Sequence, residues 1–187
     1  MTIRPIRYLG DPVLRRPADP VRDVNDSIRL LIADMIESMH AAQGVGLAAP
    51  QIGVSLQIAV FGVPDREPFA LVNPRVVSAE GTRRMDGEGC LSVPGYRSAL
   101  NRSVRVVVEA LDETGEAVRV EAEDNLLAEA LEHEVDHLNG ILYVDHLDSI
   151  EDLRKLQGQD WVSADDEDDE GSDEAESPSS TSASRSG

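Results

Sequence analysis

The sequence has little cysteine and no long uninterrupted hydrophobic run. Cys90 is the only cysteine among 187 residues, which excludes an intrachain disulfide and favours a reducing compartment. The longest apolar stretch, residues 47–63, is interrupted by proline, glutamine, glycine and serine, and is too polar to span a bilayer. The N-terminal residues lack the apolar segment of a signal peptide. We therefore expect a cytoplasmic protein that does not associate with membranes.

Basic residues are also scarce. The chain has 17 Lys and Arg against 36 Asp and Glu, a net charge of −19. Residues 164–187 hold nine of the acidic residues and one arginine, so the remainder is acidic in its own right. Such a chain offers no basic patch for phosphates, which argues against direct binding to DNA or to anionic membranes.

The C-terminal residues differ sharply in composition from the rest of the chain. Residues 165–176 are mostly acidic and residues 177–187 are mostly serine. A segment of this kind cannot bury enough apolar surface to offset the entropy of ordering it. We expect one catalytic domain over residues 1–163 and a disordered tail over residues 164–187.

Hydrophobic periodicity predicts helices and strands in alternating groups. A helix is expected over residues 26–42, with Asn25 or Asp26 as its N-cap, and a modest helix over residues 150–156. A further helix follows Asp124 or Asn125 and ends at Asn139-Gly140. Apolar, β-branched segments predict strands over 56–62, 69–78 and 141–144, and a hairpin from 103–111 and 117–123. Residues 80–88 read as a strand or a connection.

The run HEVDH, residues 133–137, carries the clearest chemistry. Histidines four apart on a helix share one face, so His133 and His137 can bind one metal ion. Glu134 follows the first ligand directly, and its carboxylate can reach a water held on that ion. This is the H-E-x-x-H arrangement of metal-assisted amide hydrolysis. Two histidines and a glutamate also occur together on helices by chance.

Cys90 is a candidate third ligand. It lies in the glycine- and proline-bounded segment 88–94, and a Cys-His-His set suits a borderline-soft divalent ion. Three protein ligands leave the fourth position open, as a catalytic metal requires. The alternative for Cys90 is a small buried hydrophobic residue. The glycine-rich segment 44–53 has an alternative too, as a packing loop between a helix and a strand.

Three stretches together resemble the signature motifs of the peptide deformylase family. They are GVGLAAPQ at 44–51, EGCLS at 88–92 and HEVDH at 133–137, in matching order and spacing. The resemblance covers residues 3–156. It implies an α+β fold, with small, mainly antiparallel β-sheets around a central helix that carries HEVDH. An N-terminal helix and a short C-terminal helix complete the expected fold. It also implies hydrolytic removal of the formyl group from the N-terminal formyl-methionine of nascent polypeptides, with release of formate.

The resemblance assigns roles residue by residue. It implies metal ligation by Cys90, His133 and His137, and general acid/base catalysis by Glu134 acting on a metal-bound water. The remaining implied roles are oxyanion donation by Gln51 and the Leu91 backbone N–H, and contact with the substrate peptide by Gly46 and Val45. The family's usual ion is Fe²⁺, and a metal-bound thiolate beside a redox-active iron is prone to oxidation. The ligands alone also admit Zn²⁺, Ni²⁺ and Co²⁺.

Glu88 and Asp136 are candidate supporting carboxylates. A ligand histidine usually donates its other N–H to a carboxylate, which orients the ring. Arg102 can balance one of the two charges. The alternative is that both acids are solvated or paired at the surface.

Glu129 departs from the family pattern. It lies four residues before His133, on the same helical face, where the resemblance implies a pocket for the methionine side chain and many relatives are apolar. Glu129 either borders that pocket, which alters the preference for the first substrate residue, or lies at its rim with the carboxylate in water.

The sequence alone leaves two competing functions open. One is a general HExxH metallopeptidase, which needs a longer open groove. The other is a non-catalytic, deformylase-like binding protein, against which the intact candidate residues argue. The expected partners are an N-formylated nascent peptide and, transiently, the ribosome. The acidic tail should be irrelevant to ribosome docking or should weakly oppose it.

Overall fold

The structure is a computed structural model that describes residues 2–64, 66–157 and 160–161. These residues form two α-helices, α1 (Asp26–Ala41) and α2 (Leu126–Leu138). They also form strands β1 (Gly46–Ala48), β2 (Ile58–Phe61), β3 (Phe69–Glu80), β4 (Arg83–Cys90), β5 (Val93–Arg102), β6 (Arg105–Leu111), β7 (Ala117–Glu123), β8 (Leu153–Gln157) and β9 (Asp160–Trp161). Short 3₁₀ turns occupy Pro12–Arg15, Ala49–Ile52, Tyr143–His146 and Ile150–Asp152.

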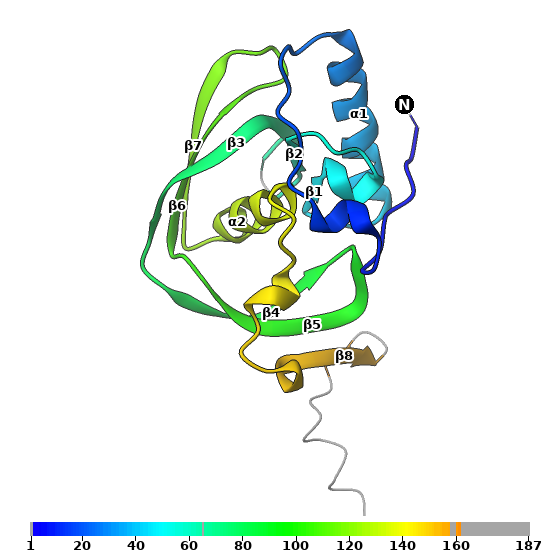
Figure 1. Cartoon of the computed structure of the whole chain (residues 1–187). Coiled ribbons are helices and arrows are strands. Elements are labelled where there is room, and N and C mark those ends of the chain that lie inside the picture. The colour runs from blue at the N-terminus through cyan, green and yellow to red at the C-terminus, as the bar shows by residue number, and fades with distance from the viewer. Residues whose placement is uncertain (1, 65, 158–159, 162–187) are drawn as a thin grey trace, which may run out of the picture.

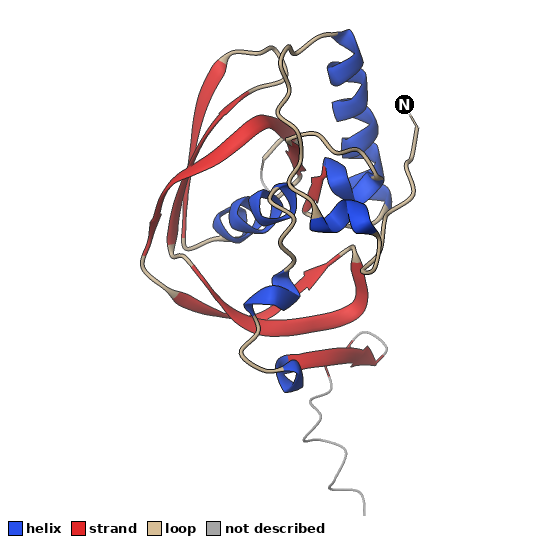
Figure 2. Cartoon of the chain, viewed as in Figure 1, coloured by secondary structure: helices blue, strands red, loops and turns tan. Residues whose placement is uncertain are grey.

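The strands form two antiparallel sheets, which confirms the expected α+β class. One sheet has the order β1-β2-β3-β6-β7 and the other the order β4-β5-β8-β9. Figure 1 shows α2 at the centre, between the long strands of the first sheet and the β4–β5 ribbon of the second. Figure 2 shows how the strands curve around this helix. The helix with HEVDH is therefore central, as predicted.

The two helices cover opposite faces of the five-stranded sheet. Successive residues of a strand point to opposite faces, and the four residues of β2 are all fully buried. Ala59 and Phe61 belong to the core cluster that contains α2, whereas Ile58 and Val60 belong to the cluster that contains α1. This two-sided burial explains why the segment is apolar without alternation.

Both helices begin at predicted N-cap residues, and α2 also ends where predicted. Asn25 accepts hydrogen bonds from the backbone N–H groups of Ser27 and Ile28, which starts α1. Asn125 accepts from the N–H of Ala128 at 3.0 Å, which starts α2. The latter helix ends at Asn139-Gly140, where a φ of 76° suits glycine.

The predicted helix over residues 150–156 is wrong. That segment is one 3₁₀ turn, Ile150–Asp152, followed by strand β8. Leu153 to Lys155 pair with Ser98 to Tyr96 on β5, and Leu153 packs against the small core beside that strand. The backbone of β5 provides hydrogen-bond partners that outweigh the local helical periodicity.

The predicted strand over residues 141–144 is also wrong. Residues Tyr143–His146 form a 3₁₀ turn, because the Asp145 carboxylate accepts a hydrogen bond from the N–H of Leu142 and tightens the chain. Leu142 and Tyr143 are buried, which accounts for the apolar character of the segment. The expected disordered tail, residues 164–187, lies outside the described residues. No helix among the residues that the structure describes is long and apolar enough to cross a membrane.

The packing of α2 on the sheet should dominate stability. Leu131 is fully buried between α2 and the five-stranded sheet, and Leu131→Ala should lower the free energy of unfolding by about 2–5 kcal/mol. Leu30→Ala on α1 is the matched control, because Leu30 is 59% exposed and its loss should cost less than about 0.5 kcal/mol. Urea denaturation of both variants measures the difference, and equal losses would contradict this account of the core.

Candidate metal centre

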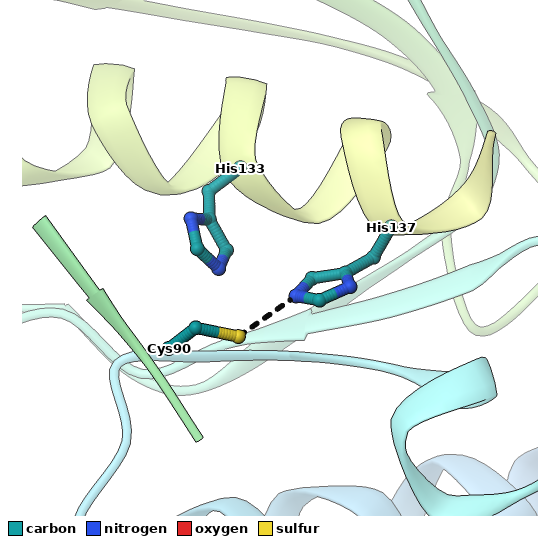
Figure 3. A group of neighbouring side chains, drawn as sticks. All are labelled: Cys90, His133 and His137. Carbon is teal, nitrogen blue, oxygen red and sulfur yellow. Dashed lines mark hydrogen bonds between the residues drawn. The ribbon is translucent and has the colours of Figure 1, made fainter. Parts of the chain in front are cut away.

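The three candidate ligands meet between α2 and the end of β4. Figure 3 shows His133 and His137 extending from one face of α2 toward Cys90. The ligand atoms of the three residues lie within 4.8 Å of one another, and Cys90 Sγ is 3.1 Å from His137 Nε2. The pairing of β4 with β5 shifts register just before Cys90, which turns the strand end toward the helix.

His133 is oriented by a buried carboxylate. Its Nδ1 lies 2.5 Å from Glu88 Oε1, and Glu88 is only 1% exposed. Burial raises the pKa of Glu88, but hydrogen bonds from Arg102 and His133 outweigh it and lower that pKa to about 2. An ionised carboxylate only accepts hydrogen bonds, so Nδ1 carries a hydrogen, and Nε2 is the ring nitrogen left to bind an ion once an ion displaces its proton.

Arg102 connects this carboxylate to a second one. Its guanidinium donates to both oxygens of Glu88, at 2.6 and 2.8 Å, and to Asp136 at 2.7 Å. His146 Nε2 lies 2.8 Å from the same Asp136 oxygen. The structure thus brings Glu88, Arg102 and Asp136 together, and it links to them a histidine for which the sequence indicated no role. Burial lowers the pKa of Arg102, but the bonds to both carboxylates outweigh it and raise that pKa.

The two ligand histidines have opposite electrostatic environments. Burial favours the neutral ring of His133, but contacts with Cys90 and Glu88 outweigh it and raise the pKa of His133. Burial and the neighbouring His133 lower the pKa of His137, whose Nδ1 has no hydrogen-bond partner among the described residues. His137 therefore resists a second proton and stays in the neutral form that binds metal ions. One thiol and two imidazole nitrogens in this arrangement fit a divalent metal ion.

Glu134 lies beside the ligands on α2 and is fully buried. Burial raises the pKa of Glu134 to about 7, and its Oε2 atom has no partner among the described residues. Gly46 passes so close that an added Cβ would lie 2.9 Å from the Glu134 side-chain carbons and nearer still to Oε1. Only glycine fits there without displacing the carboxylate.

Gln51 is held with its amide nitrogen toward Cys90. The Ala48 N–H donates to Gln51 Oε1 at 2.8 Å, which identifies the oxygen end of the amide. The Nε2 end lies 3.2 Å from Ser92 Oγ and 3.6 Å from Cys90 Sγ. Gln51 is 1% exposed, so this orientation is rigid.

The N-terminal segment, residues 7–9, forms backbone hydrogen bonds to Gln51 and Ser92. The backbone N–H of Arg7 donates to the Gln51 carbonyl at 2.7 Å, and that of Leu9 donates to the Ser92 carbonyl at 2.8 Å. Both bonds are made by the main chain, while the side chain of Leu9 is half exposed. Residues 7–9 thus bridge the first and second sequence motifs.

An open cleft of about 480 Å³ lies beside Cys90, His133 and Glu134. The predicted site residues that line it are Val45, Gly46, Gln51, Glu88, Cys90, Leu91, Glu129, His133 and Glu134. His137, Arg102 and Asp136 are not among the described residues that line it. Glu129 is half-buried at the cleft, one helical turn before His133.

Two residues of the site were not anticipated from the sequence. Ser92 is fully buried and bonds the Gln51 amide; its place two residues after Cys90 was the available signal. Tyr143 is 1% exposed and its ring lies nearly parallel to that of His133, with centroids 6.3 Å apart. The incorrect strand assignment of residues 141–144 concealed this contact.

A family model, sequence relatives and solved structures all match this chain to the same family. The family model described as polypeptide deformylase matches residues 3–153. The peptide deformylase of Dehalococcoides mccartyi (strain CBDB1) is 48% identical over 157 residues, covering 83% of this chain and 93% of its own. The crystal structure of a peptide deformylase from Legionella pneumophila superposes with a TM-score of 0.76 at 46% identity, covering 80% of this chain and 88% of its own. A peptide deformylase from Synechococcus elongatus in complex with actinonin gives a TM-score of 0.76 at 39% identity, covering 80% and 81%.

Loss of the thiol should impair metal binding. Cys90→Ser replaces a thiolate by a hydroxyl that stays protonated, so metal affinity should fall by more than the roughly 10–100-fold typical of losing a supporting residue. Competition with a chromophoric chelator measures the affinity. Glu134→Gln is the control, since Glu134 is not among the clustered ligand atoms and its loss should leave the affinity nearly unchanged. Equal affinity of Cys90→Ser and the unmodified chain would exclude Cys90 as a ligand.

Proposed function

The chain belongs to the polypeptide deformylase family, and we propose how its residues carry out that family's reaction. The enzyme removes the N-formyl group from nascent peptides, a hydrolysis that releases formate. The observation that carries the residue assignment is the cluster of Cys90, His133 and His137 with a buried carboxylate, Glu134, beside it. A divalent ion bound by these three residues supplies Lewis acidity and lowers the pKa of water toward neutrality.

Glu134 moves the proton in this proposal. Its carboxylate accepts a proton from the attacking water as the water oxygen bonds to the formyl carbon. The protonated side chain then donates that proton to the amine nitrogen as the carbon–nitrogen bond breaks. A pKa of about 7, caused by burial, suits a group that both accepts and donates near neutral pH.

Gln51 and Leu91 stabilise the negative charge that develops on the formyl oxygen when the water attacks the formyl carbon. We assign Gln51 Nε2 as one donor, because the bond from Ala48 to the other end of its amide points Nε2 into the site. The second donor is the backbone N–H of Leu91, in the turn that directly follows Cys90. A single donor of this kind contributes about 2.7–4 kcal/mol to lowering the barrier. A neutral amide does so without repelling the ion.

We infer the substrate contacts from the edge strands of the two sheets, which lie beside the site. Gly46 lies on β1, at one edge of the five-stranded sheet, and Cys90 ends β4, at one edge of the four-stranded sheet. An edge strand can pair with an extended peptide through its backbone. We propose that Val45 and Gly46 contact the peptide in this way. The general HExxH metallopeptidase is not favoured, given the family, and a non-catalytic role is opposed by the intact site.

We propose Fe²⁺ as the physiological ion, with Zn²⁺, Ni²⁺ and Co²⁺ as alternatives. Support comes from the ligand set, since one thiolate and two imidazoles bind each of these ions. A thiolate beside a redox-active iron is also a site for oxidation.

We propose that the enzyme acts in the cytoplasm, where nascent formylated chains are made, and that it associates with the ribosome only transiently. The acidic composition supports weak binding to RNA and none to DNA. The catalytic domain is proposed to comprise residues 1–163.

Substitution of Glu134 tests the assigned chemistry. Glu134→Gln keeps the size of the side chain but cannot accept a proton, so kcat/KM for a formyl-methionyl peptide should fall by at least about 100-fold. A formate-release assay measures the loss, with metal content determined on the same sample. Near-normal turnover in a metal-loaded variant would refute the role of Glu134.

The metal assignment has its own test. Protein purified without oxygen should contain about one iron per chain, and its activity should decay in air as the iron site oxidises. Elemental analysis before and after exposure, together with formate release, measures both. Full, air-stable activity in protein that contains zinc would contradict the assignment of iron.

A further inference from the structure

His146 is a partly exposed histidine that the proposed reaction does not use. It lies in the 3₁₀ turn that follows α2, and its side chain is 38% exposed. Its Nε2 lies 2.8 Å from Asp136 Oδ2 on α2, and the Arg102 guanidinium donates to the same oxygen at 2.7 Å. An exposed ion pair by itself contributes little to stability. The contact therefore matters through the other groups to which Asp136 is bonded.

A continuous series of hydrogen bonds leads from His146 to the metal site. Arg102 extends from Asp136 to both oxygens of Glu88, at 2.6 and 2.8 Å, and Glu88 Oε1 lies 2.5 Å from His133 Nδ1. The exposed fraction of the side chains falls along this series, from 38% at His146 to 20% at Asp136, 5% at Arg102 and 1% at Glu88. The series thus begins at the surface and ends on the ring of a metal ligand.

The turn that carries His146 is fixed in place, whereas Asp136 is not. Tyr143 at the start of the turn is 1% exposed, and the Asp145 carboxylate accepts a backbone hydrogen bond within the same segment and pairs with Arg15. Asp136 lies in the last turn of α2, where water reaches one fifth of its side chain and competes for its oxygens. His146 is therefore a fixed donor to the more exposed of the two acids in the series.

The hydrogen in this contact belongs to His146. A carboxylate that pairs with an arginine only accepts hydrogen bonds, so Nε2 of His146 carries the hydrogen and donates it to Asp136. The neutral ring and the imidazolium ion both have such an N–H. The hydrogen bond therefore exists with either form of the ring, and a neutral donor of similar reach can replace it.

We propose that His146 is a positioning residue for the first metal ligand. Its hydrogen bond holds Asp136 against Arg102, and Arg102 held in this way keeps Glu88 aligned with Nδ1 of His133. Without His146, the Asp136 carboxylate turns toward water and Arg102 loses one of its two anchors. The His133 ring then gains freedom to rotate. The role of His146 rests on the proposed function in one respect, that His133 binds the ion.

Release of cobalt tests this role. The chain loaded with Co²⁺ is mixed with an excess of a chromophoric chelator, and the transfer of the ion is followed with time. His146→Ala should release the ion about three- to tenfold faster, which is less than the roughly 10–100-fold typical of losing a group bonded directly to a ligand. The absorption bands of bound Co²⁺ should shift or broaden as well, because they depend on the geometry of the ligands.

His40→Ala is the matched control. It makes the same substitution at an exposed histidine near the end of α1, outside the series of hydrogen bonds that ends on His133. Its release rate and its cobalt spectrum should be those of the unmodified chain.

Two further variants separate positioning from a purely structural role. His146→Gln keeps an N–H donor, so it should return the release rate to within about twofold of the unmodified chain. Asp136→Asn removes the charge that Arg102 and His146 share, and it should release the ion quickly by itself. Adding His146→Ala to Asp136→Asn should then change the rate by less than about twofold.

The possible outcomes separate the role of His146 from the proposed function. An unchanged rate and spectrum in His146→Ala, an equal change in His40→Ala, no recovery in His146→Gln, or effects that multiply in the double variant would each overturn the positioning role. Formate release by the unmodified, cobalt-loaded chain tests the reaction separately. Normal formate release with an unchanged His146→Ala would overturn the positioning role alone. The expected release rates without any formate would overturn the reaction alone, and failure to bind cobalt would overturn both.

Discussion

The buried Glu88 carboxylate is the interaction on which the rest of the site depends. It joins β4 to Arg102 at the end of β5 and to His133 on α2, so one side chain connects two strands and a helix. Removing a charge from water costs several kcal/mol, which only a full set of hydrogen bonds offsets. Here both carboxylate oxygens are occupied. The contribution of this ion pair is therefore the orientation of the first ligand rather than net stability.

The site forms where α2, packed on the five-stranded sheet, meets the separate four-stranded sheet. The five-stranded sheet and α2 share one apolar core, which fixes the helix and its two histidines. The β4–β5 ribbon belongs to another sheet and presents the thiol from the opposite side. On the side of the five-stranded sheet, Gly46 sets the clearance between β1 and α2, because any larger residue would displace Glu134. Rigid strands and a helix, rather than flexible loops, thus carry most of the reacting groups.

Much of this arrangement was predictable from sequence because its signals are local. The spacing of His133 and His137, the Asn125 cap and the β6–β7 hairpin each depend on a few adjacent residues. The errors occurred where distant partners decide the structure. Leu153 joins β8 because β5 offers a backbone to pair with, and the Tyr143 turn depends on Asp145 and on the space beside His133. The contact between His146 and Asp136 likewise requires the chain to return to α2 after Gly140.

The bridge made by residues 7–9 has a consequence for how this protein tolerates sequence change. Its two bonds to the active site use only backbone N–H groups, and the side chains of Tyr8 and Leu9 are 57% and 50% exposed. Substitutions there can accumulate with little effect, so the positions will look unimportant when side chains are compared. The number of residues between the two bonds cannot vary, since one insertion would move a donor past its acceptor. Drift in side-chain identity and strict constancy of length thus coexist in the same three residues.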